Sequence, residues 1–225
     1  AVPMAPAQDY KRIGDGDQGP NTGGMGSYSP DPGIEQEEVE ELARAVHQPV
    51  VDELRRRGTP YHGVLYAGLM RTAGGPRVLE YNCRFGDPET QAVLPRLRDD
   101  LLDLLERSTR PGGLEGVELS WSSSWAVTVV LASCGYPSSS SKGDPIGGLD
   151  AVDFEGVEFL HAGTAERGGQ LVTAGGRVLN VTGLGDSPSE ARRRAYDAAD
   201  RIEFDGKQLR RDIGARAEDR VAAGI

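Results

Sequence analysis

Apolar residues recur at helical spacing over one stretch in the first quarter of the chain. They lie between Ile34 and Arg57, at Val39, Leu42, Ala43, Val46, Val50 and Leu54. Acidic residues fill the start of this stretch, three arginines close it and Gly58 follows, as at the ends of many helices. The pattern predicts an amphipathic helix over 34–57 that bends at Pro49. A leucine-rich stretch predicts a shorter helix over 99–107.

Two runs of strand-like composition lie between these helices, at 61–72 and 77–84. The residues that join them, Ala73-Gly74-Gly75-Pro76, favour a tight turn. The pair therefore predicts an antiparallel hairpin.

The second half of the sequence predicts a separate small sheet. Its strand-like runs are 125–132, 157–161, 170–174 and 177–182. A helix over 188–202 follows, and its start is well marked because Ser187 and Glu190 form a capping box around Pro188. These elements predict an antiparallel sheet with a helix on one face. Since Pro111-Gly112-Gly113 interrupts the chain beforehand, we assign an α+β fold class and divide the sequence into domains 1–113 and 114–225.

Residues 9–33 show neither the helical nor the strand spacing of apolar residues, and they are rich in Gly, Asp, Pro, Asn and Ser. This composition predicts a loop. Gly-x-Gly-x-x-Gly at 14–19 is no dinucleotide fingerprint, because Pro20 follows it and no helical pattern opens there. A Walker loop also fails, because Met25 stands where Lys is required. The glycines would let the backbone approach a ligand and offer N–H groups to anionic oxygens. A flexible surface loop is the alternative.

Charge and composition narrow the class of partner. The 225 residues include 25 Lys and Arg against 35 Asp and Glu, a net charge of −10, which argues against a phosphate-backbone binder. No apolar run reaches the roughly 18 residues of a membrane span. Cys83 and Cys134 form no C-x-x-C pair. We therefore expect no nucleic-acid partner, no membrane span, no disulfide or structural zinc, and a reduced, cytoplasmic setting.

One predicted strand has a wholly polar face. Because side chains alternate, Glu80, Asn82 and Arg84 project from one side of it and the residues between them from the other. The first two supply oxygen ligands about 7 Å apart along the strand, a spacing that suits one Mg²⁺ shared with phosphate oxygens. Asp87 and Glu89 add two carboxylates beyond the strand end, where ligands often bind. The alternative is an ordinary solvent-facing strand.

Both polar segments together resemble one known family. The runs 8–26 (QDYKRIGDGDQGPNTGGMG) and 82–91 (NCRFGDPETQ) are similar to those of the phosphoribosylamine–glycine ligase family, also called glycinamide ribonucleotide synthetase. The likeness continues through Lys142-Gly143-Asp144 and 211–214 (RDIG) and covers essentially the whole chain. It implies the later lobe of an ATP-grasp domain, an antiparallel sheet with helices, followed by a small C-terminal α+β domain. It also implies an amino-terminal part that this sequence lacks.

The resemblance implies a reaction and its participants. The family joins glycine to 5-phosphoribosylamine through glycyl phosphate, giving glycinamide ribonucleotide, ADP and phosphate in purine biosynthesis. ATP, glycine and 5-phosphoribosylamine would be the substrates, and the missing amino-terminal part of the same protein would be required. Mg²⁺ or Mn²⁺ is the metal that the family uses.

The resemblance also implies roles for individual residues. Glu80 and Asn82 match the metal ligands. Arg84 and Asp87 are candidates for the carboxylate and the amine of glycine, by charge complementarity. Lys11 and Arg12 would face the transferring phosphate. The expected substrate contacts are Asn21, Thr22, Gly23, Gly24, Met25, Gly26 and Glu89.

Two other interpretations stay open. The chain could be a non-catalytic remnant or binding domain, or it could be part of another ATP-grasp carboxylate–amine ligase. Many ATP-grasp enzymes have a third acidic metal ligand on the strand before the metal pair, but residues 65–69 include no acid. The number of metals is therefore left open. His47, His62 and His161 have no ligand spacing, and we expect them at surface or core positions.

Overall fold

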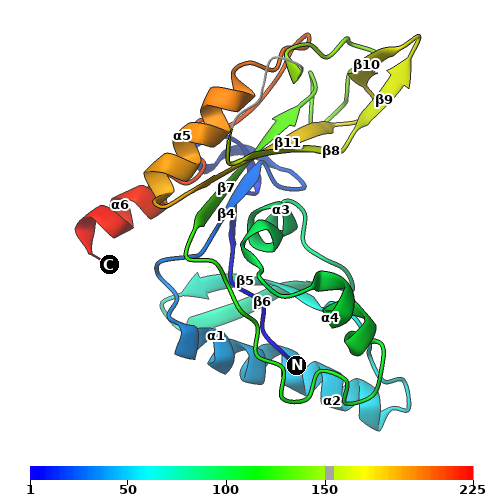
Figure 1. Cartoon of the computed structure of the whole chain (residues 1–225), viewed down its shortest axis with the longest axis vertical. Helices are drawn as coiled ribbons and strands as arrows, with labels where there is room; N and C mark the ends of the chain where they lie inside the picture. The colour runs from blue at the N-terminus through cyan, green and yellow to red at the C-terminus, as the bar shows by residue number, and fades with distance from the viewer. Residues whose placement is uncertain (150–154, 225) are drawn as a thin grey trace. The chain divides into compact units, whose positions relative to one another are not determined.

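The computed structural model describes residues 1–149 and 155–224, which form two compact units (Figure 1). Unit 1 comprises Ala1–Pro6, Ile34–Gly86 and Leu97–Ser122, and unit 2 comprises Ala7–Gly33, Asp87–Arg96 and Ser123–Ile225. Each unit is thus assembled from three separate pieces of sequence. The division of the sequence into domains 1–113 and 114–225 stays a prediction.

The predicted long helix of unit 1 is present as three consecutive helical segments. These are α1 (Gln36–Leu42), a π-helical turn (Ala43–His47) and α2 (Gln48–Arg56). Pro49 lies at the start of α2, directly after the π turn, so the helical run is irregular next to the proline. The predicted bend at Pro49 stays a prediction. Gly58 follows with φ +77°, a left-handed conformation that favours glycine.

The predicted hairpin of unit 1 is confirmed with shorter strands. β5 (Tyr66–Thr72) pairs antiparallel with β6 (Gly75–Asn82), with a register shift between Gly68 and Leu69. Residues 61–65 and 83–84 lie outside the strands, contrary to the prediction. The short helix is also confirmed, as α4 (Leu101–Ser108), whose N-terminus is capped by the Asp100 carboxylate.

Unit 2 contains a five-stranded antiparallel sheet. Its strands in spatial order are β1 (Gln8–Asp9), β4 (Gly26–Ser29), β7 (Trp125–Ala132), β11 (Arg177–Gly185) and β8 (Val157–His161). The prediction of a loop over 9–33 is therefore wrong in part. β4 is too short and too rich in small residues to show a period, and it owes its place to backbone pairing with β7.

A helix covers one face of this sheet. α5 (Pro188–Ala199) packs on β11 and β7, as Figure 1 shows in orange against green and yellow. The close approach requires Gly183, where a Cβ would lie 2.2 Å from the Ala191 carbonyl oxygen. The predicted N-cap is confirmed, because Ser187 Oγ accepts from the Glu190 N–H at 3.2 Å, while the Glu190 carboxylate accepts from the Asp186 N–H at 2.9 Å, one residue before the N-cap. The helix ends three residues earlier than predicted, at Ala199.

Smaller elements complete unit 2. A hairpin of β2 (Arg12–Gly14) and β3 (Gln18–Asn21) encloses a 3-10 turn (Asp15–Asp17). The others are α3 (Glu89–Val93), the 3-10 turn Leu94–Arg96, the hairpin β9 (Thr164–Arg167) and β10 (Gln170–Thr173), and α6 (Ala215–Ala223). In the part of the chain that the structure describes, no helix has the length and apolarity needed to cross a bilayer.

Candidate functional site

The predicted metal pair lies on β6 in unit 1. Glu80 is paired with Gly68 across the hairpin, and Asn82 with Tyr66. Arg84 lies two residues beyond the strand, yet its Nη2 donates to Asn82 Oδ1 at 3.4 Å, so the two side chains are adjacent. Tyr81 turns the other way and donates from its hydroxyl to the Val46 carbonyl at 2.8 Å. Asn82 and Arg84 thus contact each other, whereas Tyr81 has a different partner.

The donor set around this pair is small. Among the described residues, no group of three or more His, Cys, Asp or Glu side chains is arranged to hold a metal ion. Glu80 and Asn82 offer one carboxylate and one amide oxygen, which suits a hard cation that takes most of its ligands from water and phosphate. The pair therefore fits Mg²⁺ or Mn²⁺ only in the company of a phosphate group.

The glycine-rich segment lies in unit 2 and is tied down by hydrogen bonds. The Thr22 N–H and hydroxyl both donate to the Lys11 carbonyl, at 2.7 and 2.9 Å. The Gly23 N–H donates to the Tyr136 hydroxyl, the Gly24 N–H to Thr22 Oγ1, and the Met25 N–H to the Tyr10 carbonyl. These four N–H groups are thus already engaged, so in this conformation they do not offer themselves to an anion as the glycine pattern suggested.

The members of this segment differ in exposure. Asn21 is exposed and Thr22 is half-buried, whereas the Met25 side chain is fully buried in unit 2. The Gly24 backbone adopts φ +116° and lies so close to its neighbours that a Cβ would be 2.4 Å from Pro88 Cδ and 2.8 Å from Asp9 Oδ1. A glycine is needed here for both reasons.

The β2–β3 hairpin is anchored by the carboxyl-terminal part of the chain. The Arg210 side chain is fully buried and donates to both carboxylate oxygens of Asp212, at 2.7 and 2.6 Å. Its Nη1 also donates to Asp17 Oδ1 at 3.0 Å and to the Arg12 carbonyl at 3.1 Å. Asp212 in turn accepts from the Gly16 N–H at 2.9 Å. Burial opposes the charge of Asp212, but these hydrogen bonds outweigh it and lower its pKa.

A second arginine joins two of the predicted segments. Arg177 Nη1 donates to the Gly23 carbonyl at 3.0 Å and to the Asp87 carbonyl at 2.9 Å, and it lies 3.2 Å from Asp87 Oδ1. Gly23 and Asp87 are therefore neighbours of one guanidinium although 64 positions separate them in sequence. Sequence reasoning did not single out either arginine: Arg177 has no local motif around it, and Arg210 lies just outside the run 211–214.

A buried carboxylate that sequence reasoning passed over lies beneath Gly24. The Asp9 side chain is 10% exposed, and its Oδ2 is 2.6 Å from Lys11 Nζ. Burial, and next the negative charge of nearby Glu89, raise the pKa of Asp9 to about 6 despite the attraction of Lys11. Lys11 is thus already paired with an acid, while Glu89 is itself buried.

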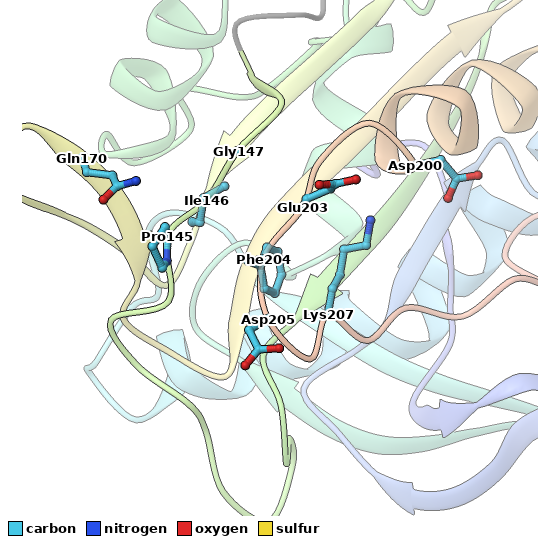
Figure 2. Close-up of a pocket in the computed structure, with 9 residues that line it drawn as sticks. All are labelled: Pro145, Ile146, Gly147, Gln170, Asp200, Glu203, Phe204, Asp205 and Lys207. Carbon is cyan, nitrogen blue, oxygen red and sulfur yellow. The ribbon is translucent and has the colours of Figure 1, made fainter.

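An open pocket of about 670 Å³ lies elsewhere in unit 2 and contains none of the predicted site residues (Figure 2). Its lining is Pro145, Ile146, Gly147, Gln170, Asp200, Glu203, Phe204, Asp205 and Lys207. The Lys207 ammonium donates to the Ala199 carbonyl at 3.0 Å and to the Ile202 carbonyl. It therefore caps the end of α5, and three carboxylates leave the pocket wall acidic.

Comparison with known proteins first defines the class. Residues 1–90 match "Phosphoribosylglycinamide synthetase, ATP-grasp (A) domain", and residues 126–216 match "Phosphoribosylglycinamide synthetase, C domain". The fold is also that of the biotin carboxylase domain of Hydrogenobacter thermophilus 2-oxoglutarate carboxylase, with a TM-score of 0.55 over 83% of this chain and 40% of that one at 13% identity. The chain thus has the ATP-grasp fold.

The two matched domains belong to one family, and this chain is a member of the phosphoribosylglycinamide synthetase family. It is 55% identical to the phosphoribosylamine–glycine ligase of Streptomyces coelicolor over 96% of this chain, and 49% identical to that of Mesorhizobium japonicum over 99%. The crystal structure of the Thermotoga maritima phosphoribosylamine–glycine ligase matches 94% of this chain and 51% of that one with a TM-score of 0.79 at 39% identity. The chain spans about half the length of the curated relatives it matches, 52% for each of the two named.

Proposed function

We propose that this chain supplies the later part of an ATP-dependent ligase that joins glycine to 5-phosphoribosylamine in purine biosynthesis. The observation that carries the proposal is the match to both domains of one ligase family, at about half identity to relatives that bear the ligase name. An amino-terminal part of the same protein would complete the ATP-grasp domain. A cytoplasmic setting agrees with the two cysteines, which are both free and exposed.

The proposed reaction needs ATP because a carboxylate is a poor electrophile. A carboxylate oxygen of glycine would bond to the γ-phosphorus of ATP while the bond to the β–γ bridging oxygen breaks, which releases ADP. The amine of phosphoribosylamine would then attack the acyl carbon of glycyl phosphate, phosphate would leave with the bridging oxygen, and the nitrogen would lose a proton. Cationic side chains assist both steps by offsetting charge on phosphate oxygens.

We propose specific roles for the residues of unit 1. Glu80 and Asn82 would hold Mg²⁺ or Mn²⁺, which when bound would offset the negative charge of the phosphate groups. Arg84 would bind the carboxylate of glycine, and its contact with Asn82 supports a role next to the metal pair. The planar fork of the guanidinium suits a carboxylate.

The remaining proposed roles belong to unit 2. Asp87 would bind the amine of glycine, and Lys11 and Arg12 would face the transferring phosphate. The proposed contacts with phosphoribosylamine or glycyl phosphate are Asn21, Thr22, Gly23, Gly24, Met25, Gly26 and Glu89. Met25 is buried, the N–H groups of 22–25 are engaged, and the Thr22 hydroxyl already bonds to Lys11 and Gly24. The exposed side chain of Asn21 is therefore the group of this segment best able to reach a ligand.

The test of the function is coupled turnover. We expect a full-length protein, in which this sequence follows the amino-terminal half of the Streptomyces coelicolor relative, to release ADP only when glycine and phosphoribosylamine are both present. The 225-residue chain alone should release none, since ATP and both substrates must be held together for reaction. Turnover of the full-length protein with another carboxylate or amine in preference would favour a different ATP-grasp ligase, and no turnover would favour a non-catalytic remnant.

The metal assignment has its own matched pair of variants. Glu80→Gln keeps the size of the side chain and removes the charge that a divalent cation needs, so in the full-length protein it should raise the Mg²⁺ requirement and nearly abolish phosphoryl transfer. Tyr81→Phe, its neighbour on the opposite side of β6, loses only the hydrogen bond to Val46 and should leave the Mg²⁺ titration unchanged. If the Tyr81 variant shifted the titration and the Glu80 variant did not, the metal site would lie elsewhere.

A further inference from the structure

We propose that Arg177 is a positioning residue that holds the Gly23–Gly24 segment and Asp87 together as one substrate-binding arrangement, with Tyr136 as its second support. The inference rests on the proposed function, because that function makes both segments substrate contacts. It adds a residue that neither the sequence motifs nor the resemblance assigns.

The contacts of Arg177 converge on one nitrogen. Its Nη1 lies 3.0 Å from the Gly23 carbonyl oxygen, 3.5 Å from that of Gly24 and 2.9 Å from that of Asp87, with Asp87 Oδ1 at 3.2 Å. This nitrogen carries two protons and is shared among four oxygens. The guanidinium thus acts as a common cationic centre between two chain segments, and its side chain is only 22% exposed.

The rest of the guanidinium packs flat against Gly23. A Cβ at residue 23 would lie 3.1 Å from Cζ and 3.3 Å from Nε of Arg177. A side chain there would require the guanidinium to shift by a few tenths of an ångström. The glycine at position 23 is therefore explained by the arginine and not by a left-handed backbone.

Tyr136 fixes the same segment from its other side. Its ring packs on Gly176, where a Cβ would be 2.4 Å from Cδ2, and its hydroxyl accepts from the Gly23 N–H at 2.9 Å. Gly23 is thus bonded at both its N–H and its carbonyl. The start of β11 and Tyr136 together set the orientation of the peptide groups that flank Gly23.

The expected effect is a loss of alignment more than a loss of fold. Arg177→Met removes the donor and keeps most of the side-chain volume, so Gly23 and Asp87 lose their shared partner. Small displacements of a substrate-positioning segment can cost roughly 100-fold in rate. Arg177→Lys should keep most of the alignment and most of the rate. A single nitrogen of Arg177 makes these contacts, and an ammonium can replace it.

The first measurement uses amide hydrogen exchange by NMR on the 225-residue chain, without ligands. We expect the Gly23 and Gly24 amides to exchange at least about tenfold faster in Arg177→Met than in the parent, because local opening becomes easier. Arg193→Met, which breaks a surface pair with Asp197, should leave both amides unchanged. Unchanged exchange in Arg177→Met would overturn the proposal whatever the enzyme does.

The second measurement uses the full-length protein. Arg177→Met should lower kcat/KM for phosphoribosylamine by about tenfold to 100-fold and leave the KM for ATP near its parent value, and Arg177→Lys should recover most of the loss. An equal change for all substrates would overturn the positioning role. Should Arg177→Met fail to fold, Arg177→Lys and Tyr136→Phe carry the same test in milder form. An inactive parent would refute the proposed function, while the exchange measurement would still decide the role of Arg177.

Discussion

Replacing Arg210 with Met should destabilise unit 2 by several kcal/mol. The Arg210 side chain is fully buried and binds both carboxylate oxygens of Asp212, one of Asp17 and the Arg12 carbonyl. Removing one partner of a buried ion pair costs about 3–5 kcal/mol, because the charge left behind loses its compensation. The two acid side chains are 28% and 41% exposed, so water compensates them in part. We therefore expect a loss of about 2–4 kcal/mol.

Urea unfolding can measure this loss. Trp125 begins β7 in unit 2, so its fluorescence in a Trp121→Phe background reports on that unit. The midpoint should fall in Arg210→Met while the slope m stays constant, which identifies a change in stability and not in the unfolded state. The midpoint of Arg210→Lys should lie between those of the parent and Arg210→Met, since Lys keeps the charge and loses the bidentate fork.

A surface ion pair provides the matched control for this experiment. Arg193→Met is the same substitution at a pair whose side chains are 63% and 57% exposed, and it should cost less than about 0.5 kcal/mol. If Arg210→Met cost no more than Arg193→Met, the buried cluster would contribute nothing beyond an exposed pair. The anchoring of the β2–β3 hairpin would then have to come from its backbone contacts.

Two further predictions concern unit 2. The Asp9 carboxyl keeps its proton up to about pH 6 when folded but loses it near pH 4 when unfolded, so stability should fall as pH rises between these values. Asp9→Asn removes the cost of ionising a buried carboxyl. The free energy of unfolding of the variant minus that of the parent, measured by urea titration, should therefore increase by on the order of 2–3 kcal/mol between about pH 4 and pH 7.5. The same difference at both pH values would contradict the raised pKa of Asp9. Ser187→Ala removes the acceptor for the Glu190 N–H and should cost about 1 kcal/mol by the same assay, whereas no change would mean that the cap is dispensable for α5.

The elements that the sequence predicts well are those with a local cause. The capping box at Ser187 sets the start of α5, and the Gly-rich turn between β5 and β6 gives the hairpin. The long apolar run of β7 identifies a buried strand. Each signal lies within about ten residues of the element it predicts. Helix ends and strand ends are less certain, because neighbouring segments decide how far each one extends.

The elements that the sequence does not predict depend on distant partners. β4 pairs with β7 about 100 positions later, and no residue pattern within Gly26–Ser29 predicts that pairing. The same holds for the candidate site, where motif chemistry points to Glu80, Asn82 and the glycine-rich segment. The arginines that arrange that segment stand more than 150 positions away, and no spacing rule connects Arg177 with Gly23 or Arg210 with Asp17.

The strand order of unit 2 has a consequence for synthesis and truncation. During translation β1 and β4 leave the ribosome about 100 residues before β7, so they wait without their sheet while the intervening segments emerge. A shortened chain that began at residue 126, where the second family match starts, would lack both strands. One edge of β7 would then be exposed. That edge is a row of unpaired backbone groups along an apolar strand, which invites pairing between molecules. Residues 7–33 therefore protect the edge of the carboxyl-terminal sheet from pairing with other molecules.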